Sequence, residues 1–198
     1  MTKTIDYYLT LTSPWTYLGS ARFEEMARAH GVEIRVKPVN YGVIFPRTGG
    51  LPLPKRAPER QAYRLMELKR WRAYLDIPLN LHPKHFPVPD ADAACMVIAA
   101  EKSGGDPLRL AHAILRAVWV EDKDITDIPT LAEIAQANGH DGERLAAAAQ
   151  EPETRAAYEA STEAAIARGV FGAPMYIYND ELFWGQDRLE FLDRALAA

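Results

Sequence analysis

The sequence predicts an α/β fold in which a βαβ unit at the N-terminus and a ββα unit at the C-terminus flank a large all-α insertion. Two observations predict this fold. Apolar residues alternate as in strands only within residues 4–38 and 175–184. Between these segments, apolar residues recur at spacings of three and four, which indicates amphipathic helices. The sheet is therefore expected to form only when the two ends of the chain come together.

The N-terminal unit begins with alternating apolar residues over 4–11, which predict a strand. Ser13 is a good N-cap, and Pro14 suits the first helical position because its missing N–H would be unpaired there in any case. The helix is expected to run to about Ala29. Alternation then resumes over 32–38, and a right-handed crossover of this kind makes the two strands parallel.

The middle of the chain reads as helices separated by irregular segments. Residues 40–58 are rich in proline, so they are predicted to form a long loop of the kind that often borders a site. Helical spacing dominates residues 57–168, with a second proline-rich segment at 80–90. Another helix is expected to open at Thr130-Leu131-Ala132-Glu133, which matches a capping box.

Strand signals return near the C-terminus. Residues 175–178 and 181–184 are separated by Asn179-Asp180, which predicts a hairpin, and a final helix follows. Among small α/β folds, this order of elements is the thioredoxin arrangement. We therefore predict a thioredoxin-like domain made of residues 1–40 plus 169–198, and a helical insertion domain made of residues 41–168 with loops bordering the active site.

The charge balance disfavours two classes of partner. The net charge is −4, with 23 basic and 27 acidic residues, which leaves no broad cationic surface for nucleic acid or anionic lipid. The start of the chain lacks the apolar region of a signal peptide, and no apolar run approaches the roughly 20 residues that span a bilayer. We expect a soluble, cytoplasmic protein that binds neither nucleic acid nor membranes.

The cysteine count restricts the chemistry. A single cysteine, Cys95, excludes an internal disulfide, Cys-x-x-Cys chemistry and a multi-cysteine zinc site. Because Cys95 lies within a helical pattern, it is expected to be a small core residue. The five histidines are scattered without metal-ligand spacing, so no metal is expected.

The thioredoxin arrangement places chemistry at two positions. A reactive group is expected at the start of the first helix, where amide donors stabilise an anion, and Ser13-Pro14-Trp15-Thr16 occupies that place. A cis proline is expected immediately before the third strand, where Ala173-Pro174 stands. On its own, Ser13-Pro14 is most often only a helix cap. The motifs near the C-terminus that are described next favour a functional role for Ser13 instead.

Several motifs together carry a resemblance to a known family. They are Ser-Pro-Trp-Thr-Tyr-Leu-Gly at 13–19, Arg70-Trp71 leading to Ile77-Pro78-Leu79, Ala117-Val118-Trp119, residues 169–174, and Phe183-Trp184-Gly185-Gln186-Asp187-Arg188. In order and over nearly the whole chain, they resemble the 2-hydroxychromene-2-carboxylate isomerases. These enzymes belong with the kappa-class glutathione transferases in the DsbA-like branch of the thioredoxin superfamily.

The resemblance implies that glutathione is the cofactor and that Ser13 hydrogen-bonds its sulfur. The pKa of a free thiol is about 8.5, and lowering it by two units requires about 2.7 kcal/mol of stabilisation of the thiolate relative to the thiol. A helix N-terminus supplies at most about 2 kcal/mol, so the hydroxyl donor is a necessary supplement. The other implied contacts are Ala173 and Pro174 at the cysteinyl portion, Gln186 and Asp187 at the γ-glutamyl end, Arg188 holding the loop, and Trp184 and Gly185 shaping the wall.

The resemblance also implies a cis–trans isomerisation, in which the sulfur adds to a small aromatic or conjugated keto-acid substrate and leaves again. Substrate contacts are expected between the two subdomains, from Lys55, Arg56, His85 and Trp119. Trp119, however, is more often a core residue. His85 stands where the family presents a tyrosine, and the loop that contains Lys55 and Arg56 lacks the family's asparagine. The resemblance therefore does not determine the identity of the substrate.

Two other functions stay open on the sequence. A kappa-like transferase or peroxidase would bind glutathione in the same way, and so would a non-catalytic glutathione-binding module. A disulfide oxidoreductase is disfavoured because residues 13–16 contain no cysteine. A homodimer is possible, since dimers are common in the family.

Overall fold

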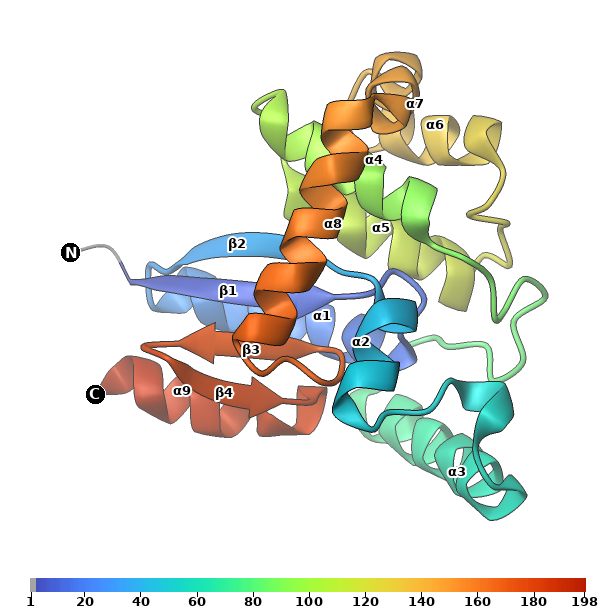
Figure 1. Ribbon diagram of the computed structural model, residues 1–198. Helices are drawn as coiled ribbons and strands as arrows, with labels where there is room; N and C mark the ends of the chain where they lie inside the picture. The colour runs from blue at the N-terminus through green and yellow to red at the C-terminus, as the bar shows by residue number, and fades with distance from the viewer. Residues whose placement is uncertain (1–2) are drawn as a thin grey trace.

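A computed structural model describes residues 3–198 and confirms the predicted α/β fold (Figure 1). Its four strands are β1 (Thr4–Leu9), β2 (Glu33–Pro38), β3 (Met175–Tyr178) and β4 (Glu181–Trp184). They form one sheet in the order β2-β1-β3-β4. β1 is parallel to β2 and antiparallel to β3, while β3 and β4 form the predicted hairpin. The two ends of the chain therefore build the sheet together.

Helices cover both faces of the sheet. Figure 1 shows α1 (Pro14–Ala29) and α9 (Leu189–Ala197) behind the sheet, and α8 (Pro152–Ala167) crossing in front of it. Side chains alternate between these faces along β1, because successive residues of a strand point to opposite sides. Tyr7 packs with the α1 side of the core, whereas Tyr8 belongs to the cluster on the α8 side.

The remaining long helices are α3 (Pro58–Leu75), α4 (Ala91–Lys102), α5 (Pro107–Trp119), α6 (Ile128–Ala137) and α7 (Gly142–Gln150). Helices α4 to α7 pack on one another and form the helical block, whereas α3 lies apart from them and packs against α1 (Figure 1). Cys95 on α4 is fully buried among apolar side chains, as expected for a core residue. The division of the chain into two units at residues 40 and 169 stays a prediction.

The segment predicted as a long loop is partly helical. It contains α2 (Tyr41–Thr48) and a short 3-10 helix, η1 (Leu53–Lys55). The Gly42 N–H donates to the Asn40 side chain at 2.9 Å, which caps the start of α2. The sequence did not predict this helix because Pro46, a residue that usually ends helices, lies inside it. Burial of Ile44 holds the helix in place.

The predicted start of α6 was also wrong. The helix begins at Ile128, two residues before the expected capping box, because Asp127 is the N-cap. The Thr130 N–H donates to the Asp127 carboxylate at 2.9 Å. Thr130 therefore lies inside the first turn instead of preceding it.

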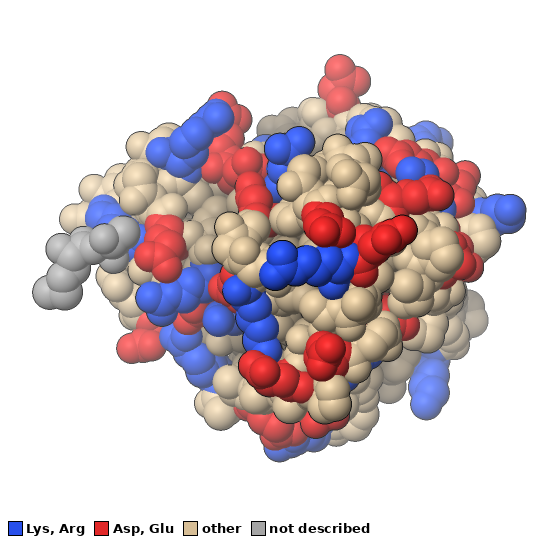
Figure 2. All heavy atoms as spheres, turned by 90° about the horizontal axis from the view of Figure 1, so that it is seen from above, with Lys and Arg blue, Asp and Glu red and all other residues tan. Residues whose placement is uncertain are grey.

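The surface carries charges of both signs. Figure 2, the view from above, shows Lys and Arg side chains interspersed with Asp and Glu across that face. Over the described residues, no helix combines the length and the apolar character that crossing a membrane requires.

Candidate active site

Strand pairing brings three distant segments to one edge of the sheet. Tyr8 of β1 pairs with Met175 of β3, which in turn pairs with Trp184 of β4. The residues just beyond this register, Pro174 and Gly185, are joined by a hydrogen bond of 2.9 Å from the Gly185 N–H to the Pro174 carbonyl. The chain leaves β1 at the same edge and enters α1, so the start of that helix belongs to the same site.

Ser13 caps α1 and keeps a hydrogen to donate. The residue is only 8% exposed, and its Oγ accepts a hydrogen bond of 3.2 Å from the Thr16 N–H. Within residues 3–198 this is the only hydrogen bond of the hydroxyl, so the O–H itself is available. A hydroxyl donor at a helix N-terminus, where amide dipoles favour negative charge, is suited to an anion.

The segment before β3 offers an open stretch of backbone. The Ala173–Pro174 peptide bond is cis. Over residues 3–198, the N–H and C=O of Ala173 form no backbone hydrogen bond with the rest of the chain. The neighbouring Gly172 carbonyl is held by the Tyr41 hydroxyl at 2.7 Å. An extended peptide could therefore pair with Ala173 at a position that is already fixed.

An acidic residue from the helical block fixes the turn before Ser13. The carboxylate of Asp90 accepts hydrogen bonds from the Leu11 N–H at 2.8 Å and from the Thr10 hydroxyl. Burial raises the pKa of Asp90, and these two hydrogen bonds act in the opposite direction. Sequence reasoning did not identify this contact, because Asp90 stands at the start of α4 and reads as a helix cap.

Gln186 is held by Arg22 on α1. It is 2% exposed, and Arg22 donates to its backbone carbonyl at 3.0 Å and also to its side-chain oxygen. Burial lowers the pKa of the Arg22 guanidinium. The structure thus places the Gln186 side-chain oxygen in a contact with α1, whereas the sequence predicted it at the γ-glutamyl end of a ligand.

The exposed residues of this turn lie differently. Asp187 and Arg188 form a surface ion pair at 3.5 Å and both remain exposed. Gly185 has a φ of 97°, and a Cβ there would lie 2.5 Å from the Asp187 carboxylate, so only glycine fits the turn. Trp184 is about half exposed and meets Phe171 edge-on, with ring centroids 4.8 Å apart. Asp187 is therefore an exposed carboxylate in the turn that follows the exposed Trp184.

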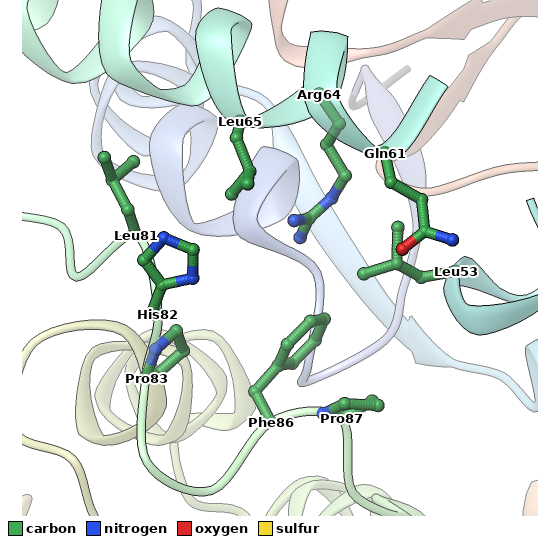
Figure 3. Close-up of a pocket in the computed structure, with 9 residues that line it drawn as sticks. All are labelled: Leu53, Gln61, Arg64, Leu65, Leu81, His82, Pro83, Phe86 and Pro87. Atoms are coloured by element: carbon green, nitrogen blue, oxygen red, sulfur yellow. The ribbon is translucent and has the colours of Figure 1, made fainter. Parts of the chain in front are cut away.

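A cavity of about 350 Å³ lies between α3 and the segment that precedes α4. Its lining residues are Leu53, Gln61, Arg64, Leu65, Leu81, His82, Pro83, Phe86 and Pro87 (Figure 3). Asp90 follows closely after Pro87 and binds Leu11, so the wall of this cavity runs beside the turn that leads to Ser13. This volume falls within the usual range of small-molecule sites.

The four residues predicted to contact substrate do not line this cavity. Trp119 is fully buried, and its ring supports Phe86 from behind at 4.8 Å; its burial corrects the expectation of direct contact. His85 pairs with Asp124 at 3.4 Å. The other two, Lys55 and Arg56, lie at the end of η1, where Lys55 is exposed and the Arg56 side chain donates to the Leu51 carbonyl at 2.8 Å.

Arg64 is the residue that the sequence analysis missed in this cavity. A signal was present, because Arg64 lies four residues before Leu68 and seven before Trp71, on the buried stripe of α3. A charged residue in register with such a stripe is either paired or functional.

Among the described side chains, no group of three His, Cys, Asp or Glu residues is placed to hold a metal ion.

Fold and site together define a thioredoxin-like protein with serine at the helix start where redox members carry cysteine. Residues 4–197 match the family model described as a DSBA-like thioredoxin domain. The chain therefore belongs to the DSBA-like thioredoxin family.

Individual relatives agree with this assignment over the full length. A 2-hydroxychromene-2-carboxylate isomerase from Sphingobium xenophagum is 28% identical over 197 residues, covering 99% of both chains. Glutathione S-transferase kappa 1 from Homo sapiens is 24% identical, covering 98% of this chain and 91% of that protein. A solved structure of a 2-hydroxychromene-2-carboxylate isomerase superposes with a TM-score of 0.82 at 26% identity, covering 98% of this chain and 94% of that one.

Proposed function

We propose that this protein is a cytoplasmic, glutathione-dependent isomerase that acts on 2-hydroxychromene-2-carboxylate or a similar aromatic catabolite. The observation that supports the proposal is that strand pairing brings the segments that carry three groups to the same end of the sheet. These are the Ser13 hydroxyl with its free hydrogen, the unbonded backbone of Ala173 and the exposed carboxylate of Asp187. The full-length similarity to named isomerases supports the same reaction class.

The three groups fit the parts of glutathione. Ser13 would donate to the sulfur, and the N-terminus of α1 would stabilise a negative charge on it. The N–H and C=O of Ala173 would pair with the cysteinyl backbone, while Asp187 would bind the γ-glutamyl ammonium group. Trp184 would close the wall beside Asp187.

Glutathione, when bound, would supply a thiolate that forms a bond to carbon and later leaves, so that no net oxidation or reduction occurs. The residues of the chain have a simpler task. Ser13 holds its hydrogen toward the sulfur and lowers the free energy of the thiolate. The cavity beside α3 would hold the substrate close to that sulfur and exclude water from it.

A transferase is the second candidate function. The specific observation that favours it is the 24% identity to a kappa-class glutathione transferase over 98% of this chain. Both functions need the same glutathione site and differ in the cavity, where Arg64 and Phe86 stand. A non-catalytic glutathione-binding module would bind glutathione at that site and would bind no substrate in the cavity.

Calorimetry with glutathione tests the shared part of the proposal. Wild type should bind glutathione with millimolar or better affinity, and Ser13→Ala should bind its thiolate less well. Ser20→Ala is the matched control, since the Ser20 hydroxyl is also buried on α1 but donates to the Tyr17 carbonyl. Absence of binding by wild type contradicts the proposal.

Two activity assays then separate the reactions. Loss of the chromene absorbance in the presence of glutathione supports the isomerase. Conjugation of an aryl halide with no change of the chromene supports the transferase. Binding without either activity supports the module.

A further inference from the structure

Arg64 projects from α3 into the cavity and toward Phe86 (Figure 3). Its guanidinium carbon lies 5.3 Å from the centroid of the Phe86 ring and 5.9 Å from that of Trp119. Both distances are in the range of cation–π contacts. The guanidinium is therefore held in place by aromatic rings.

No acidic group compensates this charge. Over residues 3–198, Arg64 forms neither an ion pair nor a hydrogen bond with another side chain. The nearby charge is positive instead: burial first, and then Arg56, lower the pKa of Arg64 to about 10. Burial and Arg60 act in the same direction on Arg56. Arg64 is thus the one arginine of the cavity lining, and among the described residues no carboxylate pairs with it, which favours an anionic ligand.

The geometry leaves the bonding edge of Arg64 free. The N–H donors of a guanidinium lie in its plane and match both oxygens of a carboxylate, and within residues 3–198 no side chain accepts a hydrogen bond from those of Arg64. The rest of the lining is mostly apolar, with Leu53, Leu65, Leu81 and Phe86. A ligand that suits both features has a carboxylate attached directly to a flat, apolar body.

We propose that Arg64 binds the carboxylate of an aromatic or conjugated monocarboxylic acid, and that Phe86 and the leucines hold its unsaturated body. This inference depends on the proposed function only in so far as the bound acid is the substrate of the isomerisation. Binding of the acid itself needs no glutathione. Arg64, and not the predicted Lys55 or Arg56, is then the residue that selects acids over neutral analogues.

Calorimetry without glutathione tests the inference with two probes of the same shape, trans-cinnamate and trans-cinnamamide. Wild type should bind the acid about ten- to a hundredfold more tightly than the amide, as expected for a hydrogen-bonded charge pair in a partly buried site. Arg64→Gln should remove that preference by weakening the acid alone. Arg64→Lys should fall between the two, because it keeps the charge and loses the planar fork.

The control variant is Arg60→Gln, which removes a positive charge from the same helix at an exposed position outside the cavity lining. It should change the affinity for the acid by less than about threefold, because exposed charges act weakly. Equal affinity of wild type for the two probes, or no binding of cinnamate, overturns the inference. If Arg64→Gln does not fold, the comparison of the two probes on wild type still decides.

The outcome is separate from that of the glutathione titration. Acid binding through Arg64 without glutathione binding would defeat the proposed function and leave this inference standing. Glutathione binding with no preference for the acid would do the reverse.

Discussion

The backbone N–H of Leu11 donates a hydrogen bond of 2.8 Å to the carboxylate of Asp90, a residue 79 positions further along the chain. Asp90 occupies the N-cap position of α4 but forms no side-chain cap bond with its own helix. Its carboxylate serves the turn that leads to Ser13. The position of the candidate thiol-activating serine therefore depends on the helical block as well as on the sheet.

Replacement of Asp90 tests this dependence. Asp90→Ala should lower the free energy of unfolding by about 1–3 kcal/mol, because it leaves the Leu11 N–H without a partner in a partly buried turn. Asp90→Asn keeps an acceptor oxygen and should cost much less. Urea unfolding of the three proteins measures both values. Equal losses in the two variants would show that charge, and not acceptance of the hydrogen bond, is what matters at Asp90.

The same carboxylate predicts a pH dependence. Burial raises the pKa of Asp90 above its ordinary value of 3.8, so the folded state binds the proton more tightly than the unfolded chain. The associated stability is fully present below 3.8 and is lost as the pH rises through the folded pKa. We expect the free energy of unfolding of wild type, minus that of Asp90→Asn, to fall over this interval. A difference that rises with pH would contradict the assignment.

Ser13→Ala should raise the thiol pKa of bound glutathione by about one to two units, which corresponds to one lost hydrogen bond to a charged group. Ultraviolet absorbance of the thiolate against pH measures this shift. Ser20→Ala should leave the thiol pKa unchanged. Because Ser13 also caps α1, its replacement should cost about 1 kcal/mol of stability, which urea unfolding measures separately. An unchanged thiol pKa would reduce Ser13 to a helix cap.

Arg22→Gln should weaken glutathione binding by about tenfold, or about 1.4 kcal/mol. The reason is that Arg22 holds Gln186, and with it the turn that presents Asp187. Calorimetry measures the effect, with Arg28→Gln as a control on the exposed last turn of α1. Arg22 acts through position, so Arg22→Lys should restore part of the affinity. Loss of stability without loss of affinity would contradict this role.

Gly19→Ala should separate the Gln186 turn from α1. A Cβ at Gly19 would lie 2.7 Å from the Cβ of Gln186, closer than side chains approach one another. We expect a loss of about 1–3 kcal/mol in the free energy of unfolding, as for other overpacked sites, together with weaker glutathione binding. Urea unfolding and calorimetry measure the two effects. Unchanged values would show that the turn moves freely away from the helix.

Local signals predicted most of the sheet and its first helix. α1 runs from Pro14 to Ala29 as expected, because its cap and its first proline are adjacent in sequence. The hairpin was equally predictable, since Asn179 and Asp180 adopt φ values of 49° and 63° that their side chains tolerate in a tight turn. These elements are determined by residues that are neighbours along the chain.

The missed elements depend on partners that are distant in sequence or hidden by proline. α2 contains Pro46, a residue that normally ends a helix, and it persists because Tyr41 and Ile44 are buried. At the start of α6, both Asp127 and Thr130 are plausible N-cap residues. Asp127 is the N-cap in the structure, because its carboxylate accepts a hydrogen bond from the Thr130 N–H. Boundary errors of this kind come from several plausible caps close together.

The candidate site could be assigned from the sequence where the family motifs lie, and not where contacts between distant residues build it. Ser13 and Pro174 were placed from their motifs. Asp90 and Arg22 act on residues far along the chain, so spacing could not identify them. Trp119 was predicted as a substrate contact, but it lies behind Phe86 in the core. An aromatic residue near a pocket and one that lines it look alike in a sequence.

The hydrogen bond between Gly185 and Pro174 has a consequence for protein synthesis. Ser13 leaves the ribosome long before either of these residues has been translated, so the nascent chain carries a capped helix without the opposite wall. Under the proposed function, glutathione could bind only after β3 and β4 have been released and have paired with β1. A premature stop before Trp184 would therefore yield a chain that contains Ser13 and Ala173 but lacks the Gly185 N–H that binds the Pro174 carbonyl.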